Sequence, residues 1–169
     1  KNNFFTDVSN YILYEFGQPT HCYDSKKIGN KITLERNSDR KNFETLLDQE
    51  IRLDANELVF VSDKEVINLA GIVGGKNTSC SENTKSVIVE CAYFNPEEII
   101  GKSIKFDIKS DAAYRFERGV DPLCHKDALR RFLKIVDEHA TIKNVELYSE
   151  SFSDFEHIRI PFIPKNINK

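Results

Sequence analysis

The chain has 169 residues, of which 40% are hydrophobic and 30% charged, and its formal net charge is −3 at pH 7. This length and composition predict one folded, soluble domain with an adequate core, and the acidic balance argues against a broad electrostatic grip on nucleic acid. No apolar run approaches the length of a membrane span, and no charged-then-apolar signal segment opens the sequence.

The first predicted element is a helix that is capped by Thr6 or Asp7, continues through VSNYILYEF and ends at Gly17. A loop is expected over Gly17–Asp24, where Pro19 fixes the backbone just before His21. A lone histidine is usually a surface or structural residue. The position of His21 on a stiffened loop makes it a candidate site residue.

Short strands are predicted next, because apolar and polar residues alternate in Lys31–Arg36 and short apolar runs follow. The other expected strands are Ile51–Leu53, Leu58–Val61 and Val66–Ala70, with a turn at Asp63-Lys64 and a further short turn over Phe43–Leu47. This density of strands and turns indicates a sandwich-like or barrel-like β core.

Glycines follow in Ala70–Gly75 (AGIVGG), without the lysine and hydroxyl residue of a phosphate-binding loop. The favoured interpretation is a tight turn that needs positive φ. An alternative is that Gly74 and Gly75 leave room for a ligand to approach the backbone.

A core strand is predicted over Ser86–Phe94, and it carries a carboxylate, Glu90, among apolar and small neighbours. A carboxylate in such a place must be paired, neutralised or used. Glu90 is therefore the residue of greatest interest in the chain.

Helices dominate the rest of the pattern. Asn95-Pro96 predicts a brief helix, Asp121-Pro122 repeats the helix start signal, and HKDALRRFLKIVDEH, residues 125–139, is strongly amphipathic.

In Val145–Phe152 apolar and polar residues alternate again, which predicts a strand, and Ile158–Lys169 suggests a further strand that leads into another part of a larger polypeptide. Together the elements predict an α+β fold, with a β-sandwich-like core of short strands flanked by helices in three layers.

The four cysteines, at positions 22, 80, 91 and 124, form no CxxC pair and no zinc-like spacing, so we expect reduced thiols and no metal site. Cys91 is a candidate nucleophile with His21, although a core thiol is the commoner role for such a residue.

Four stretches in order, DVSNYILYEFGQPTHCYD, LAGIVGG, VIVECAYFNPEEI and SDAAYRFERGVDP, resemble the β-subunit family of bacterial phenylalanyl-tRNA synthetase. The resemblance runs from Asn3 to about Val136 and is to the central editing module. The tail resembles the entry to the family's next domain. The resemblance thus implies an editing module over residues 1–155 and a linker over residues 156–169.

The resemblance implies that the module hydrolyses tyrosine wrongly attached to tRNA-Phe. It assigns reading of the phenol to Glu90, placement of the tRNA 3′ end or of the attacking water to His21, and the pocket wall to Gly74, Gly75, Ser110 and Ala112. It implies no cofactor for this step, whereas the intact cytoplasmic enzyme uses ATP and magnesium together with an α subunit.

This chain also departs from the family pattern, because Ser110 stands where many relatives have threonine, and the neighbours of His21 differ as well. These departures leave open an alternative function, a tRNA-binding or scaffold module with an inactive pocket.

Overall fold

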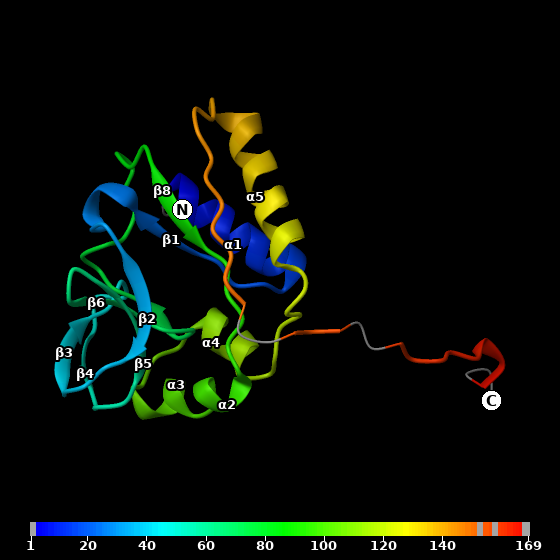
Figure 1. Ribbon diagram of the computed structural model, residues 1–169, viewed down its shortest axis with the longest axis horizontal. Coiled ribbons are helices and arrows are strands. Elements are labelled where there is room, and N and C mark those ends of the chain that lie inside the picture. Colours follow the sequence, from blue (N-terminus) through cyan, green and yellow to red (C-terminus); the bar gives the residue numbers. More distant parts are fainter. Residues whose placement is uncertain (1–2, 152–153, 157–158, 167–169) are drawn as a thin grey trace.

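The computed structural model describes residues 3–151, 154–156 and 159–166, and within them small antiparallel sheets are flanked by helices (Figure 1). The strands are β1 (His21–Asp24), β2 (Ile32–Arg36), β3 (Lys41–Glu44), β4 (Glu50–Leu53), β5 (Leu58–Ser62), β6 (Glu65–Leu69), β7 (Val73–Gly74) and β8 (Val87–Glu90). The helices are α1 (Phe4–Phe16), α2 (Pro96–Ile99), α3 (Lys102–Lys105), α4 (Asp111–Phe116) and α5 (His125–His139), with 3-10 turns η1 (Ser25–Lys27) and η2 (Pro164–Asn166). The predicted α+β class is confirmed.

The largest sheet has four strands in the order β2-β5-β6-β7. Its central hairpin turns at Asp63 and Lys64, as predicted, and both residues adopt positive φ, 48° and 69°. Such left-handed turns match the twist of the flanking strands. Val59 and Leu69 pair across this hairpin and are both buried in the main core.

The site depends on a separate two-stranded sheet in which β1 pairs antiparallel with β8. Helices α1 and α5 lie side by side and cover it (Figure 1). Their contact forms a second apolar cluster with the β1 residue Cys22, made by Val8, Ile12, Ala128 and Phe132. This cluster therefore fixes β1 against the helical layer.

The boundaries of α1 show what a local pattern can and cannot predict. The helix ends at Gly17, whose φ of 70° gives the expected left-handed cap. The predicted start at Thr6 or Asp7 is wrong, because the side chain of Asn3 accepts a hydrogen bond from the Thr6 N–H at 3.1 Å and begins the helix three residues earlier.

Two predictions between these elements also need correction. His21 does not lie in a loop but begins β1, because the segment gains backbone partners from β8. Phe43 lies in β3 rather than in a turn, since it pairs with Ile51 of β4.

The C-terminal segment forms no strand over residues 145–151, contrary to prediction, and these residues are exposed. Phe152 lies outside the described residues. Of the strand predicted over Ile158–Lys169, residues 159–166 are described and contain η2 but no strand; residues 158 and 167–169 lie outside the description. In Figure 1 residues 159–166 lie away from the folded body. The domain division at residue 155 stays a prediction.

No helix in the described part of the chain is long and apolar enough to cross a membrane.

We expect Phe132→Ala to lower the free energy of unfolding by about 3–5 kcal/mol, because it empties the centre of the α1–α5 contact, where Phe132 is 2% exposed. Lys134→Ala, on the exposed side of the same helix, is the matched control and should change it by less than about 0.5 kcal/mol. Urea unfolding of both variants checks this; equal effects would show that the contact contributes little.

Candidate active site

A cavity of about 500 Å³ lies beside the β1–β8 sheet, between α1 and the N-terminus of α4. This volume falls within the range of small-molecule sites. Five of the six residues predicted from the resemblance line the cavity, namely His21, Gly74, Glu90, Ser110 and Ala112. Segments far apart in the sequence therefore meet at one hollow.

His21 and Glu90 are opposite one another in the β1–β8 register. The imidazole ring makes an edge-to-face contact with Tyr23, with 4.5 Å between ring centroids. Its Nε2 atom is buried and has no hydrogen-bond partner among the described residues. Burial lowers the pKa of His21 to about 4, so the ring is neutral at pH 7 and its Nε2 atom is a buried polar group that lacks a protein partner.

Glu90 is held by hydrogen bonds and not by an ion pair. The Tyr23 hydroxyl donates to its Oε2 atom at 2.6 Å, and the Asn68 amide lies 3.5 Å from the same oxygen. Burial raises the pKa of Glu90 to about 7, although the hydrogen bond from Tyr23 opposes this rise. The other oxygen, Oε1, has no hydrogen-bond partner within the described part of the chain. Glu90 thus offers one open oxygen beside a cavity.

The glycines have separate roles. A Cβ atom on Gly74 would lie 2.2 Å from Cε1 of His21, so the absence of a side chain lets the imidazole pack against the backbone. Gly75 does not line the cavity; its N–H donates to the carbonyl of Ile67 at 2.8 Å, and a Cβ atom there would lie 2.9 Å from that oxygen. The positive φ expected of the glycine turn, 72°, is found at Gly71.

Ser110 and Ala112 form the wall of the cavity at α4. The Ser110 hydroxyl accepts a hydrogen bond from the Ala113 N–H at 3.2 Å and so caps α4. This cap fixes the wall and uses one lone pair of the hydroxyl, whose O–H can still donate. Ala112 adds a small apolar surface, which leaves space for a ligand.

All four cysteines are free thiols. Cys91 does not line the cavity, and burial raises its thiol pKa to about 12. Because the thiolate is the nucleophilic form, Cys91 is poorly placed for the alternative of cysteine catalysis. Within the described ranges, no three His, Cys, Asp or Glu side chains are grouped to hold a metal ion.

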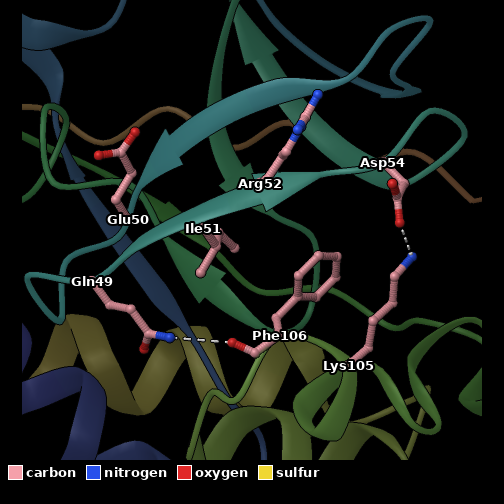
Figure 2. Close-up of a pocket in the computed structure, with 7 residues that line it drawn as sticks. All are labelled: Gln49, Glu50, Ile51, Arg52, Asp54, Lys105 and Phe106. Carbon is pink, nitrogen blue, oxygen red and sulfur yellow. Dashed lines mark hydrogen bonds and ion pairs between the residues drawn. The ribbon is translucent and has the colours of Figure 1, made fainter.

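A second hollow of about 290 Å³ lies between β4 and the end of α3 (Figure 2). Three of its polar side chains already have partners, since Lys105 pairs with Asp54 at 2.9 Å and Gln49 donates to the Phe106 carbonyl at 3.2 Å. Figure 2 shows Glu50 and Arg52 on the strand face opposite Ile51. None of the predicted site residues lies here, so we assign the chemistry to the larger cavity.

Sequence reasoning did not identify Tyr23 and Asn68 as part of the site. Tyr23 is two residues after His21, so both side chains project from the same face of β1. Asn68 is a buried amide in the otherwise apolar end of β6. A polar residue inside an apolar run was the one signal available for Asn68, and no local pattern indicated its partner.

Residues 1–141 match the B3/4 domain family. The phenylalanine–tRNA ligase beta subunit of Francisella tularensis is 37% identical over 139 residues, which are 82% of this chain and 18% of that protein. The subunits of the same name from Neisseria meningitidis serogroup B and Legionella pneumophila strain Paris are 37% and 40% identical over 130 residues, covering 77% of this chain and 16% of each relative. The chain therefore spans less than a fifth of the length of these relatives.

We expect Glu90→Gln to raise the free energy of unfolding at pH 8 by on the order of 3 kcal/mol. The pKa of Glu90 rises from 4.5 in the unfolded chain to about 7 in the folded protein, and each unit of this shift corresponds to about 1.4 kcal/mol. Below pH 4.5 the carboxyl is protonated in both states and costs nothing. Between pH 4.5 and 7 only the folded state keeps the proton, so wild-type stability falls as pH rises.

Urea unfolding from pH 4 to pH 8 measures the difference in the free energy of unfolding between the variant and the wild type. Glu138→Gln, at an exposed position on α5, is the control and should give a difference that does not depend on pH. If Glu90→Gln changes the free energy of unfolding by the same amount at pH 4 and at pH 8, the raised pKa of Glu90 is contradicted.

Proposed function

The chain belongs to the B3/4 domain family, and from this premise we propose that it is part of a phenylalanine–tRNA ligase beta subunit and hydrolyses tyrosine wrongly attached to tRNA-Phe. The observation that carries the proposal is the open oxygen of Glu90 at the side of the cavity.

The need for such a site follows from the two amino acids. Tyrosine differs from phenylalanine by one hydroxyl, and an apolar synthetic pocket rejects an added hydroxyl poorly. A second site that hydrogen-bonds the phenol can separate the two. Phenylalanine in that site would leave a buried acceptor unpaired, which costs about 1–3 kcal/mol and more for a charged group.

The geometry around Glu90 supports this selection. Its Oε2 atom is already occupied by Tyr23, so a substrate phenol would meet Oε1. Its pKa of about 7 keeps a large fraction of the carboxylate ionised at neutral pH, and an ionised carboxylate is a strong acceptor for a phenolic O–H. We propose Glu90 as the group that reads the substrate.

His21 supports the chemical step of the proposal. Its neutral imidazole and buried, unpaired Nε2 atom can orient an attacking water or the terminal ribose of the tRNA. Water attacks the ester carbonyl, and the bond to the tRNA 3′-terminal oxygen breaks, which releases tyrosine and tRNA-Phe. Cys91 does not line the cavity, and burial raises the thiol pKa of Cys22 and Cys80, which do line it. We therefore propose direct water attack without a covalent intermediate.

For the whole enzyme we propose the partners that the family resemblance implies, tRNA-Phe and a catalytic α subunit in the cytoplasm. ATP and magnesium would serve the ligation of phenylalanine, and the hydrolysis in this module would need neither.

The test is deacylation of Tyr-tRNA-Phe by the intact ligase that carries this chain. We expect Glu90→Ala to slow this hydrolysis by about 10- to 100-fold, because the phenol loses its acceptor. Glu97→Ala, an exposed acid on α2, is the control and should leave the rate unchanged. Normal turnover by Glu90→Ala would refute the role of Glu90. A wild-type enzyme that binds Tyr-tRNA-Phe without hydrolysing it would indicate the scaffold function instead.

Gly74→Ala tests the cavity without changing a polar group. The added methyl would overlap the His21 ring, at 2.2 Å from Cε1 and 2.6 Å from Nε2, so we expect the ring to move and hydrolysis to fall at least tenfold. Thermal unfolding of the variant shows whether the fold survives. Full activity in a folded Gly74→Ala enzyme would show that the position of His21 does not matter.

A further inference from the structure

We propose that Tyr23, oriented by Asn68, is a positioning residue that satisfies one oxygen of Glu90 and presents the other to the substrate. The consequence for selection rests on the proposed editing function, whereas the hydrogen-bonded arrangement itself does not.

Tyr23 reaches Glu90 from within the protein. It is 1% exposed and does not line the cavity, whereas Asn68 and Glu90 both do. In the β1–β8 register Tyr23 is opposite Ile88, so its hydroxyl reaches Glu90 diagonally across the sheet. The tyrosine therefore supports the site and does not fill it.

The direction of the hydrogen bonds follows from the chemistry of the groups. The Asn68 Nδ2 atom can only donate, and it lies 2.9 Å from the Tyr23 hydroxyl oxygen. The single hydroxyl hydrogen of Tyr23 is then directed at Oε2 of Glu90, 2.6 Å away. The opposite orientation of the Asn68 amide would place its oxygen against the carboxylate, which is unfavourable. Burial raises the pKa of Tyr23 well above its usual value, so it remains a donor.

This arrangement holds both candidate residues at once. The hydroxyl fixes the carboxylate of Glu90, and the ring contacts His21 with a centroid distance of 4.5 Å. A carboxylate held through one oxygen cannot rotate freely, so its second oxygen keeps a defined position in the cavity. Such preorganisation is what a site needs to recognise one hydroxyl.

Tyr23 also affects the ionisation of Glu90, which burial dominates. Its hydrogen bond favours the charged form and offsets part of the effect of burial, so removal of the hydroxyl should raise the pKa of Glu90 above about 7. The other ionisable side chains that line the cavity with Glu90 are His21, Cys22, Cys80, Lys109 and Asp111, and Cys91 follows Glu90 in the chain.

The first experiment compares Tyr23→Phe with the wild type by following the Glu90 carboxyl carbon in a ¹³C NMR titration of the 169-residue chain. Phenylalanine keeps the ring contact with His21 and removes only the hydroxyl. We expect the titration midpoint to rise by at least about half a pH unit. Tyr114→Phe is the control and should leave it unchanged, because Tyr114 is exposed on α4 and stacks with Arg118. An unchanged midpoint in Tyr23→Phe overturns the proposal.

The second experiment measures the pH dependence of Tyr-tRNA-Phe deacylation by the intact ligase. We expect Tyr23→Phe to lose activity several-fold at pH 6.5 and to recover most of it at pH 8.5, because the carboxylate then ionises without help. A loss that is equal at every pH would indicate a purely structural role and would overturn the proposal. If the wild type does not hydrolyse Tyr-tRNA-Phe at all, the proposed function fails, while the NMR titration still decides the role of Tyr23.

Asn68→Ala provides an independent variant, because it leaves the Tyr23 hydroxyl in place but removes the group that orients it. We expect a smaller rise of the Glu90 midpoint than in Tyr23→Phe, and no further rise when both changes are combined. Such non-additivity is the mark of residues that act through one another. Independent, additive shifts would show that Asn68 does not act through Tyr23.

Discussion

The pairing of β1 with β8 brings His21 opposite Glu90, although nearly seventy residues separate them along the chain. The candidate site depends on this ladder. It places Tyr23 within hydrogen-bond distance of Glu90, and it gives the segment after Pro19 the backbone partners that make it a strand. The α1–α5 contact covers the ladder from one side, so the apolar cluster there stabilises the position of the site as well as the fold.

A carboxylate in this ladder is a cost to the folded protein that a ligand can offset. Burial raises the pKa of Glu90 to about 7, so ionising this carboxyl costs more in the folded protein than ionising an exposed glutamate. Hydrogen bonds from Tyr23 and Asn68 reduce the cost without removing it, because Oε1 stays open. An acceptor that lies beside the cavity without a protein donor adds little to stability but suits recognition, since a phenol would supply the missing donor.

Local chemistry predicted several parts of the fold well. Gly17 ends α1, Asn95 caps α2, and the hairpin of β5 and β6 turns at Asp63 and Lys64. Each of these depends on a few adjacent residues whose backbone preferences are strong. Where the pattern was ambiguous, prediction failed: the alternation in residues 145–151 produced no strand, because an alternating segment forms a strand only where it finds a partner edge.

The sequence by itself determined the end of α1, the cap of α2, the turn at Asp63 and Lys64, the α+β class and, through resemblance, the residues to examine around Glu90 and His21. Only the tertiary structure decided that these two residues share a cavity, that Gly75 packs against backbone outside it, and that Tyr23 and Asn68 complete the hydrogen bonds. The reason is physical: caps and turns depend on neighbours in the chain, whereas the partner of a buried polar group is chosen by which strands meet, and sequence spacing does not record that meeting.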